Sequence, residues 1–303
     1  MQKPKMVIIL IILLIIVIPI FLKSRYLFLG MYGLLGGILT LAFDFSYGYC
    51  GLFNFSIYGF LIFGGYCTAL LIEKLGFPFF GTLPVSLVLT IVLAYILGKI
   101  ILRLRHWLFG LASLCFSMAI YTCVSSVFSD FTYGADGIRL PDLLVFEHKV
   151  GELSYFYFLS LLAGICFYTS YRVRFSKIGR AMRAIRSNET VSVSVGINIP
   201  RYLNLGFLMS AVFSGLSGAL WVQANNWATP EYFTLGINIK IFTAAIIGGV
   251  GNPMGAFIGG FLLFLLSQAL IAFEQYHVLF YGIILVVFLR FFPLGILNIF
   301  QRR

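Results

Sequence analysis

Long apolar runs separated by short polar segments dominate the sequence, and most of them approach the ~20 residues that a membrane-spanning helix requires. Within each run the apolar residues are continuous, whereas the strands of a transmembrane β-barrel alternate apolar and polar positions. The pattern therefore predicts an all-α, polytopic transmembrane helical bundle of about ten spans. The expected spans are 6–22, 26–43, 53–72, 83–102, 107–128, 153–171, 203–223, 238–250, 255–273 and 277–292.

The composition excludes most other classes of protein. Hydrophobic residues make up 61% of the 303 residues and charged residues only 10%, with a mean hydropathy of +1.01. An ordinary soluble domain carries ~25% charged residues, which cover its surface. A soluble enzyme, a disordered chain and a nucleic-acid-binding domain are therefore excluded, although the net charge is +11.

The charged residues predict how the bundle is oriented. Segment 172–201 carries seven basic residues and one acidic residue, whereas segment 129–152 carries five acidic and two basic residues. Because basic loops face the cytoplasm, we expect 172–201 inside and 129–152 outside. Alternation of the spans then places both termini in the cytoplasm and leaves Lys23 and Arg25 outside as an exception. We expect 6–22 to be a span, since no signal-peptide cleavage site follows it.

Two glycine-interrupted segments share a spacing. Asn54 stands ten residues before the Gly64-Gly65 pair, and Asn238 stands ten residues before the Gly248-Gly249 pair. The two segments cross the membrane in opposite directions in the expected topology, as the halves of an inverted repeat do, and broken helices in matching halves indicate a binding site. The alternative is chance, because the chain contains 31 glycines.

Small residues also recur at the spacing of a helix face. Ser210, Ser214 and Gly218 lie at positions i, i+4 and i+8 of one expected span. Such a stripe lets two helices approach closely, so we expect it to serve helix packing.

Few residues have the pattern of a chemical site. Asp44 is the one acidic residue with apolar or aromatic neighbours on both sides. Such a residue either serves transport or accepts a hydrogen bond at a helix end. The three histidines are scattered, the five cysteines form no C-x-x-C pair, and no P-loop sequence is present. We therefore expect no enzyme active site, no metal site and no ATP hydrolysis on this chain.

Segment 176–189 predicts a short amphipathic helix. Ile178, Met182 and Ile185 fall within ~60° of one another on a helix, and four basic residues occupy the opposite half. Two interpretations fit this pattern. The helix either lies on the anionic inner leaflet of the membrane or inserts its apolar face into a groove of a partner protein.

Further motifs follow one another in order along most of the chain. They are Asp44…Gly48-Tyr-Cys-Gly51…Asn54-Phe-Ser56, Gly64-Gly65-Tyr66, Gly179-Arg-Ala-Met-Arg-Ala-Ile-Arg-Ser-Asn-Glu189, Gly196-Ile-Asn198, Arg201-Tyr202, Ser210-Ala211…Gly215-Leu-Ser-Gly-Ala-Leu220, Pro230-Glu231, Gly248-Gly249-Val-Gly251…Gly255 and Arg290-Phe-Phe-Pro-Leu-Gly295. This ordered set resembles the permease subunits of branched-chain amino acid ABC importers and their urea-importer relatives. The resemblance covers roughly residues 30–297, and departures fall at Leu52 and Ile57, where members often have Gln and His.

The resemblance implies a single transmembrane permease domain over residues 1–303 in the bacterial inner membrane, with 172–201 as a cytoplasmic coupling loop. It implies a second permease subunit, two cytosolic ATPase subunits that hold ATP and Mg²⁺, and a periplasmic binding protein. The expected substrate-path residues are Asp44, Asn54, Ser56 and Asn238. The expected ATPase-coupling residues are Ile178, Gly179, Arg180, Met182, Arg183 and Ile185.

The substrate class stays open at this stage. Branched-chain amino acids are the larger class in the family, and Asp at position 44 is more like the urea group, so urea and short amides follow closely. Two other functions compete with the importer subunit. One is a self-sufficient carrier or channel with Asp44 as its ion or proton site, and the other is a membrane-embedded lipid-modifying enzyme. The absence of convergent His, Asp or Ser-Lys sets argues against the enzyme.

Overall fold

The computed structural model describes residues 19, 23–104, 106–145, 148–269 and 282–283. The expected first and last spans, 6–22 and 277–292, lie almost entirely outside these residues. The helices are α2 (Ser24–Phe43), η1 (Asp44–Tyr49), α3 (Ser56–Leu75), α4 (Phe79–Ile101), α5 (His106–Thr122), η2 (Cys123–Val127), α6 (Ser129–Thr132), α7 (Glu152–Phe175), α8 (Lys177–Ser187), α9 (Glu189–Ser194), α10 (Ile199–Asn225), η3 (Pro230–Tyr232), α11 (Leu235–Gly248) and α12 (Pro253–Ala269).

Within the described residues, six helical segments are long and apolar enough to cross a membrane. They lie at 24–49, 56–75, 79–101, 107–127, 152–175 and 199–225 and coincide with the second to seventh expected spans. Helices α11 and α12 coincide with the eighth and ninth but have only 14 and 17 residues. The prediction of a mainly helical, polytopic membrane bundle is confirmed, whereas the count of about ten spans stays a prediction.

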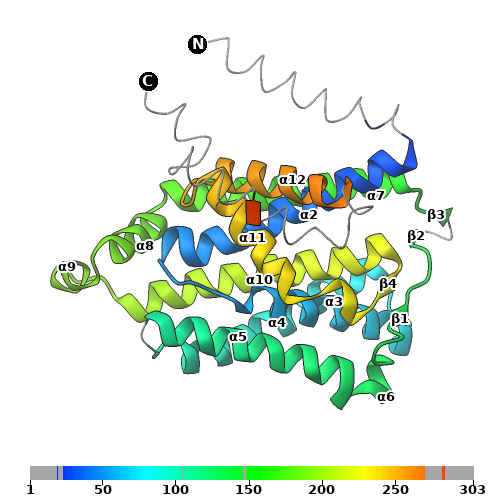
Figure 1. Ribbon diagram of the computed structural model, residues 1–303, viewed down its shortest axis with the longest axis horizontal. Helices are drawn as coiled ribbons and strands as arrows, with labels where there is room; N and C mark the ends of the chain where they lie inside the picture. The colour runs from blue at the N-terminus through cyan, green and yellow to red at the C-terminus, as the bar shows by residue number, and fades with distance from the viewer. Residues whose placement is uncertain (1–18, 20–22, 105, 146–147, 270–281, 284–303) are drawn as a thin grey trace, which may run out of the picture.

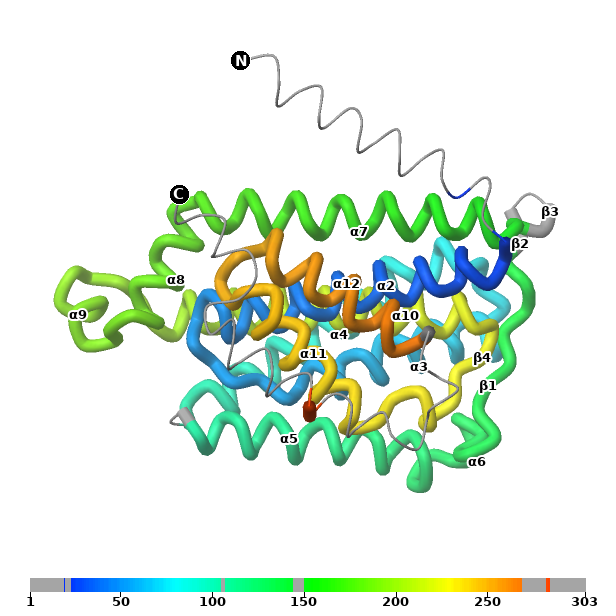
Figure 2. The backbone as a smooth tube through the Cα atoms, turned by 45° about the horizontal axis from the view of Figure 1, so that its top comes forward, coloured from blue at the N-terminus to red at the C-terminus, as the bar shows by residue number. Residues whose placement is uncertain are grey.

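Helix α10 runs through the centre of the bundle and packs against α2, α3 and α4 (Figures 1 and 2). Helix α12 lies along α2, and α11 lies beside α12. Only 22% of the apolar stretch in segment 107–127, which contains α5, is buried inside the protein. The corresponding share for segment 199–225, which is α10, is 78%. A helix that is apolar on every side must be covered by protein or by lipid. Because protein covers little of α5, we infer that α5 lies at the periphery of the bundle and faces lipid.

Small residues set the closest helix crossing. A side chain at Gly64 of α3 would collide with the backbone of Gly215 in α10, and one at Gly218 would collide with the Leu61 carbonyl. Lipid supplies no hydrophobic drive for helix association, so such packing is gained through residues that let two backbones touch. The expectation that the Ser210–Gly218 stripe serves helix packing is therefore confirmed at Gly215 and Gly218.

The two ends of the bundle differ in structure (Figure 1). Helices α8 and α9 project at one end, here called the α8 end. The opposite end carries two short antiparallel pairs, β1 (Ile138–Arg139) with β4 (Trp227–Ala228) and β2 (Leu144–Val145) with β3 (His148–Lys149).

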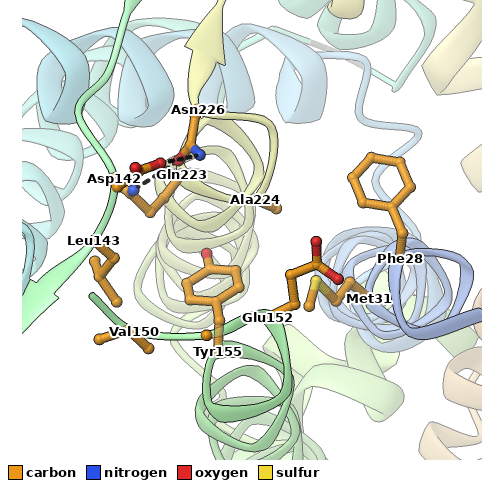
Figure 3. A pocket seen from close by; sticks show the side chains of 11 residues that line it. Phe28, Met31, Asp142, Leu143, Val150, Glu152, Tyr155, Gln223, Ala224 and Asn226 are labelled. Atoms are coloured by element: carbon orange, nitrogen blue, oxygen red, sulfur yellow. Dashed lines mark hydrogen bonds between the residues drawn. The ribbon is translucent and has the colours of Figure 1, made fainter. Parts of the chain in front are cut away.

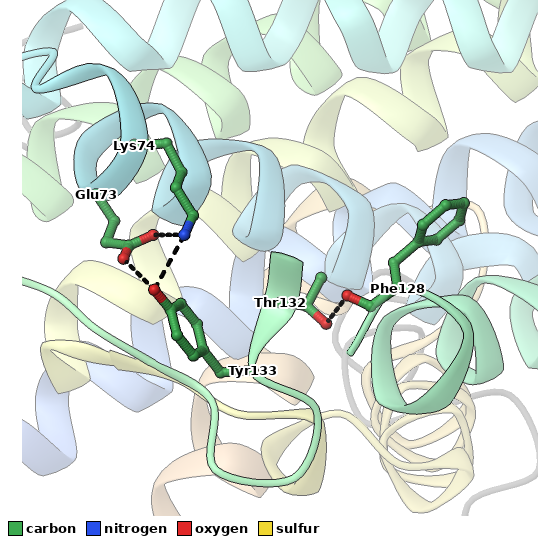
Figure 4. A network of polar contacts seen from close by, with 5 residues as sticks. All are labelled: Glu73, Lys74, Phe128, Thr132 and Tyr133. Atoms are coloured by element: carbon green, nitrogen blue, oxygen red, sulfur yellow. Dashed lines mark hydrogen bonds and ion pairs between the residues drawn. The ribbon is translucent and has the colours of Figure 1, made fainter. Parts of the chain in front are cut away.

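The end opposite α8 also carries a small polar network (Figure 4). The Tyr133 hydroxyl donates to Glu73 at 2.8 Å, and Lys74 donates to Tyr133 at 3.0 Å. The hydroxyl of Thr132 donates to the Phe128 carbonyl at 2.9 Å, which closes the turn before Tyr133. These contacts tie the loop after η2 to the end of α3.

Candidate functional site

The first broken segment begins where α2 widens into the π-helix η1 at Asp44. Single π-turns inside α-helices are rare and mark functional sites. The Asp44 side chain is completely buried, and its Oδ1 accepts a hydrogen bond of 2.5 Å from the Gly251 amide. A bond to a backbone amide is one of the two roles expected for this carboxylate. It joins η1 to the turn between α11 and α12, 207 positions further along the chain.

After η1 the chain is non-helical until Ser56, where α3 begins. Asn54 holds the first residue of that helix, because its Oδ1 accepts from the Ser56 amide at 2.9 Å and from the Ser56 hydroxyl at 2.6 Å. The Asn54 amide donates to Ser210 of α10 at 3.4 Å. Both Asn54 and Ser56 are fully buried, so the start of α3 is fixed by polar contacts inside the bundle.

Side chains from two other helices form hydrogen bonds with the backbone amide and carbonyl of Phe55, which lies outside any helix. Its amide donates to Ser113 of α5 at 3.0 Å. Its carbonyl accepts from Ser117 of α5 at 2.9 Å and from Asn238 of α11 at 3.1 Å. Non-helical backbone inside a membrane protein persists only where such partners replace the helical hydrogen bonds. The two asparagines that share the ten-residue spacing therefore meet at one break in the bundle.

The second break is the turn between α11 and α12. Gly249 and Gly251 both have positive φ, 104° and 83°, a backbone conformation that residues with a side chain rarely adopt. The side-chain oxygen of Asn252 accepts from Arg174 of α7 at 2.6 Å and from the Met254 amide at 3.3 Å. The turn is thus held by Asp44 on one side and by α7 on the other.

Aromatic rings pack the two broken segments together. Phe242 of α11 lies 4.7 Å from Phe43, 4.8 Å from Phe53 and 5.0 Å from Phe55, measured between ring centroids. These are distances at which aromatic pairs add attraction beyond simple burial. The segments are therefore joined by apolar packing as well as by the hydrogen bonds of Asp44 and Asn238.

Helix α8 is the amphipathic helix expected from the sequence, and Ser176 caps it by accepting from the Gly179 amide at 3.2 Å. Met182 and Ile185 are buried, at 1% and 5% exposure, and Met182 belongs to the main core of this chain. These two side chains are therefore unavailable to a partner, which revises the expectation that the apolar face inserts into a partner's groove. Only Ile178 of the three is exposed, at 42%.

Arg180 and Arg183 cap the end of α7. Arg180 donates to the Phe175 carbonyl at 2.8 Å, and Arg183 donates to the Arg174 carbonyl at 2.9 Å and to the Gly179 carbonyl at 3.3 Å. Positive charge at a helix C-terminus satisfies the last carbonyls and complements the helix dipole. Both arginines therefore hold the α7–α8 corner.

Arg186 has a role that the sequence analysis missed. It donates to the Gly48 carbonyl of η1, and its guanidinium lies 5.4 Å from the centre of the Tyr47 ring. The signal was present, because Arg186 follows Met182 by four positions and therefore lies at the edge of the buried face. The residue stays exposed, as its charge predicts, but its guanidinium reaches inward to the Gly48 carbonyl.

A model of the branched-chain amino acid transport system permease component matches residues 25–289. The chain belongs to this family of permeases. The resemblance drawn from its motifs is therefore confirmed, and the chain is a permease subunit of an ATP-binding-cassette importer, a multi-pass protein of the inner membrane. A transport component of this kind does not belong to an enzyme class. Importers of this type work with ATPase and binding-protein partners.

Individual relatives carry the same description. The permease is 25% identical over 285 residues to the high-affinity branched-chain amino acid transport system permease protein LivM of Escherichia coli K12, a match that covers 86% of this chain and 67% of LivM. It is 31% identical over 184 residues to LivH of the same organism, covering 55% of this chain and 58% of LivH. BraD of Pseudomonas aeruginosa is 33% identical over 126 residues, or 41% of this chain and 40% of BraD. No solved structure matches this permease.

A cavity of about 390 Å³ lies at the end opposite α8, between α2, α7 and the end of α10 (Figure 3). Asp142, Gln223 and Asn226 form one side, where Gln223 donates to Asn226 at 3.1 Å and Asn226 donates to Asp142 at 3.4 Å. Phe28 and Glu152 lie on the other side. None of the predicted substrate-path residues of the permease lines this cavity.

Proposed function

We propose that this permease forms one half of a pathway that imports branched-chain aliphatic amino acids, driven by ATP hydrolysis on partner subunits. The family match over residues 25–289 and the names of LivM and LivH support this substrate class. The chain itself binds no ATP or Mg²⁺ in this proposal, because it carries no P-loop sequence.

The expected assembly contains a second permease subunit, identical or different, two cytosolic ATPase subunits and a periplasmic binding protein. The basic segment 172–201 supports a cytoplasmic position for the α8 end by the positive-inside rule. The acidic segment 129–152 and the cavity of Figure 3 then face the periplasm. With about ten spans, both termini lie in the cytoplasm.

The meeting of the two broken segments is the observation that carries the proposed substrate path. Asn54 and Asn238 occupy equivalent places in the sequence pattern. Asn54 bonds to Ser56 and Asn238 bonds to Phe55, so both hold the break between η1 and α3. A break reached from both halves is the arrangement that inverted repeats give to a substrate site. The Oδ1 atom of Asn238 is buried without a hydrogen-bond partner among the described residues, which leaves an acceptor for a substrate group.

The proposed contact with the ATPase lies on the exposed parts of α8 and α9. Gly179, Met182 and Ile185 hold α8 on the bundle, and Arg180 and Arg183 fix its corner with α7. The exposed apolar side chains at this end then form the contact surface. They are Ile178, Val191, Val193 and Val195.

Reconstitution of the complete importer tests the proposal. The permease, purified with the subunits that accompany it, is placed in liposomes with its binding protein outside and ATP inside. We expect uptake of leucine, isoleucine or valine that requires ATP. Uptake of urea in place of these amino acids would overturn the substrate class. Uptake by the isolated permease, driven by an ion gradient without ATP, would overturn the importer and favour a carrier.

A further inference from the structure

Arg186 of α8 contacts both broken segments at once. Its Nη1 donates to the Gly48 carbonyl of η1. A methyl group placed on Gly251 would lie 3.3 Å from the same Nη1, and one placed on Gly51 would lie 3.2 Å from Arg186 Cγ. The arginine side chain therefore lies against η1, the segment after it and the α11–α12 turn, although the residue remains partly open to solvent.

Asp44 contacts the same two glycines, Gly48 and Gly251. Its Oδ1 accepts from the Gly251 amide, and a side chain on Gly48 would collide with that oxygen. The positive charges of Arg186 and Arg174 both act on the Asp44 carboxylate. Two glycine backbones thus lie between an acid and an arginine, and each glycine is bonded to one of them.

The cluster is not fully hydrogen-bonded in this arrangement. Asp44 Oδ2, Arg174 Nε and Asn252 Nδ2 are buried and have no hydrogen-bond partner among the described residues. One is an acceptor and two are donors, so a small shift of the α7–α8 corner offers them partners. A buried polar network with unpaired members is a suitable element for two alternative arrangements.

We propose that Arg186 is a positioning residue that transmits movement of α8 to the two broken segments, through the backbones of Gly48 and Gly251 and against the charge of Asp44. This inference rests on the proposed function as an ATP-driven permease. When an ATPase displaces α8, the arginine shifts η1 and the α11–α12 turn together. Both segments that meet at Asn238 and Phe55 are then moved by one side chain.

The test compares Arg186→Gln with the wild-type permease in the reconstituted importer, by measuring ATP hydrolysis and amino acid uptake in the same liposomes. Glutamine keeps a donor but loses the charge and the reach of the guanidinium. We expect ATP hydrolysis to persist while uptake per ATP falls about tenfold or more, the factor that corresponds to one charge-assisted hydrogen bond. A merely structural defect lowers both rates together and leaves their ratio unchanged.

Arg172→Gln is the matched control. Arg172 is an exposed arginine near the same end of the bundle, and its guanidinium lies 6.0 Å from the ring centre of Tyr168 on its own helix. We expect its ratio of uptake to ATP hydrolysis to equal that of the wild type. In the double variant Asp44→Asn/Arg186→Gln, the ratio should be no lower than in Arg186→Gln alone, because both act through one cluster.

Hydrogen exchange in nanodiscs supplies a readout that does not depend on transport. Arg186→Gln should speed exchange of the Gly251 amide and its neighbours and leave the α3–α10 crossing unchanged. Unchanged exchange at Gly251, or an unchanged ratio of uptake to ATP hydrolysis, would overturn the inference. A wild-type importer without ATP-driven uptake would instead contradict the proposed function, while the exchange measurement would still decide whether Arg186 holds the turn.

Discussion

Asn238 of α11 donates a hydrogen bond of 3.1 Å to the carbonyl of Phe55, 183 positions earlier in the chain. The same carbonyl also accepts from Ser117, so it retains a partner if Asn238 is changed. The Asn238 Oδ1 has none among the described residues, and burial of an unpaired acceptor costs free energy. An apolar residue of similar size at this position would bury no unpaired acceptor.

Asn238→Leu should therefore separate stability from transport. We expect the free energy of unfolding to change by less than about 1 kcal/mol, because the lost hydrogen bond and the removed unpaired acceptor offset each other. Uptake should fall about tenfold if the amide contacts the substrate or sets the break. Thermal unfolding of the purified permease and uptake in liposomes measure the two effects.

Thr243→Val is the control for that variant. Thr243 lies on α11, is buried, and donates to the Ile239 carbonyl of its own helix at 2.8 Å. It should leave uptake close to wild type. Normal uptake by Asn238→Leu would remove Asn238 from the substrate path.

Gly64→Leu and Gly248→Leu should each prevent folding or transport. A side chain at Gly64 meets the backbone of Gly215, and one at Gly248 meets the backbone of Gly255. Overpacking costs about 1–3 kcal/mol where side chains can move, and more where backbone must yield. Gly164→Leu on α7 is the control, since nothing lies within 4 Å of a methyl group there. Size-exclusion profiles measure folding, and uptake in liposomes measures transport. Tolerance of both core variants would refute the hypothesis that the two glycine-interrupted segments form a matched pair.

The six spans among the described residues were predictable because each depends only on a local property, the length of an apolar run. The shared spacing of Asn54 and Asn238 also identified two segments that meet in the fold. The partner of Asn238 was not predictable, because a backbone carbonyl such as that of Phe55 leaves no mark in the sequence. It becomes a hydrogen-bond acceptor only where the helix breaks.

The structure of α8 was predictable in part for a similar reason. The helical pattern identified an apolar face, but Met182 and Ile185 carry the same signal whether they pack on a partner or on this chain. Arg186 lies at the edge of that face, and only the tertiary contact with Gly48 shows that its charge points inward. Sequence patterns indicate which face is buried without identifying what covers it.

Asp44→Asn should leave substrate recognition unchanged and lower the rate. Asparagine retains an acceptor for the Gly251 amide but loses the charge that faces Arg174 and Arg186. We expect the substrate concentration at half-maximal uptake to stay near wild type. The maximal rate should fall about fivefold or more, the factor that corresponds to the lower end of typical coupling free energies between sites. Uptake measured over a range of leucine concentrations separates the two. An altered order of preference among substrates would instead show that Asp44 lines the substrate path.

Val191→Asp with Val195→Asp should release the ATPase without unfolding the permease. The two valines are 57% and 69% exposed and lie four positions apart, so the charges meet a partner and not the core. Burial of each valine in a complex contributes about 1.5–3 kcal/mol, so copurification with the ATPase should be lost. Ser194→Asp adds a charge to α9 without removing apolar surface and is the control. Met182→Asp should act differently, because it buries a carboxylate in the core and lowers the stability of the permease itself. If the ATPase stays bound to the double valine variant at wild-type stoichiometry, the contact lies elsewhere and the exposed valines face the lipid surface.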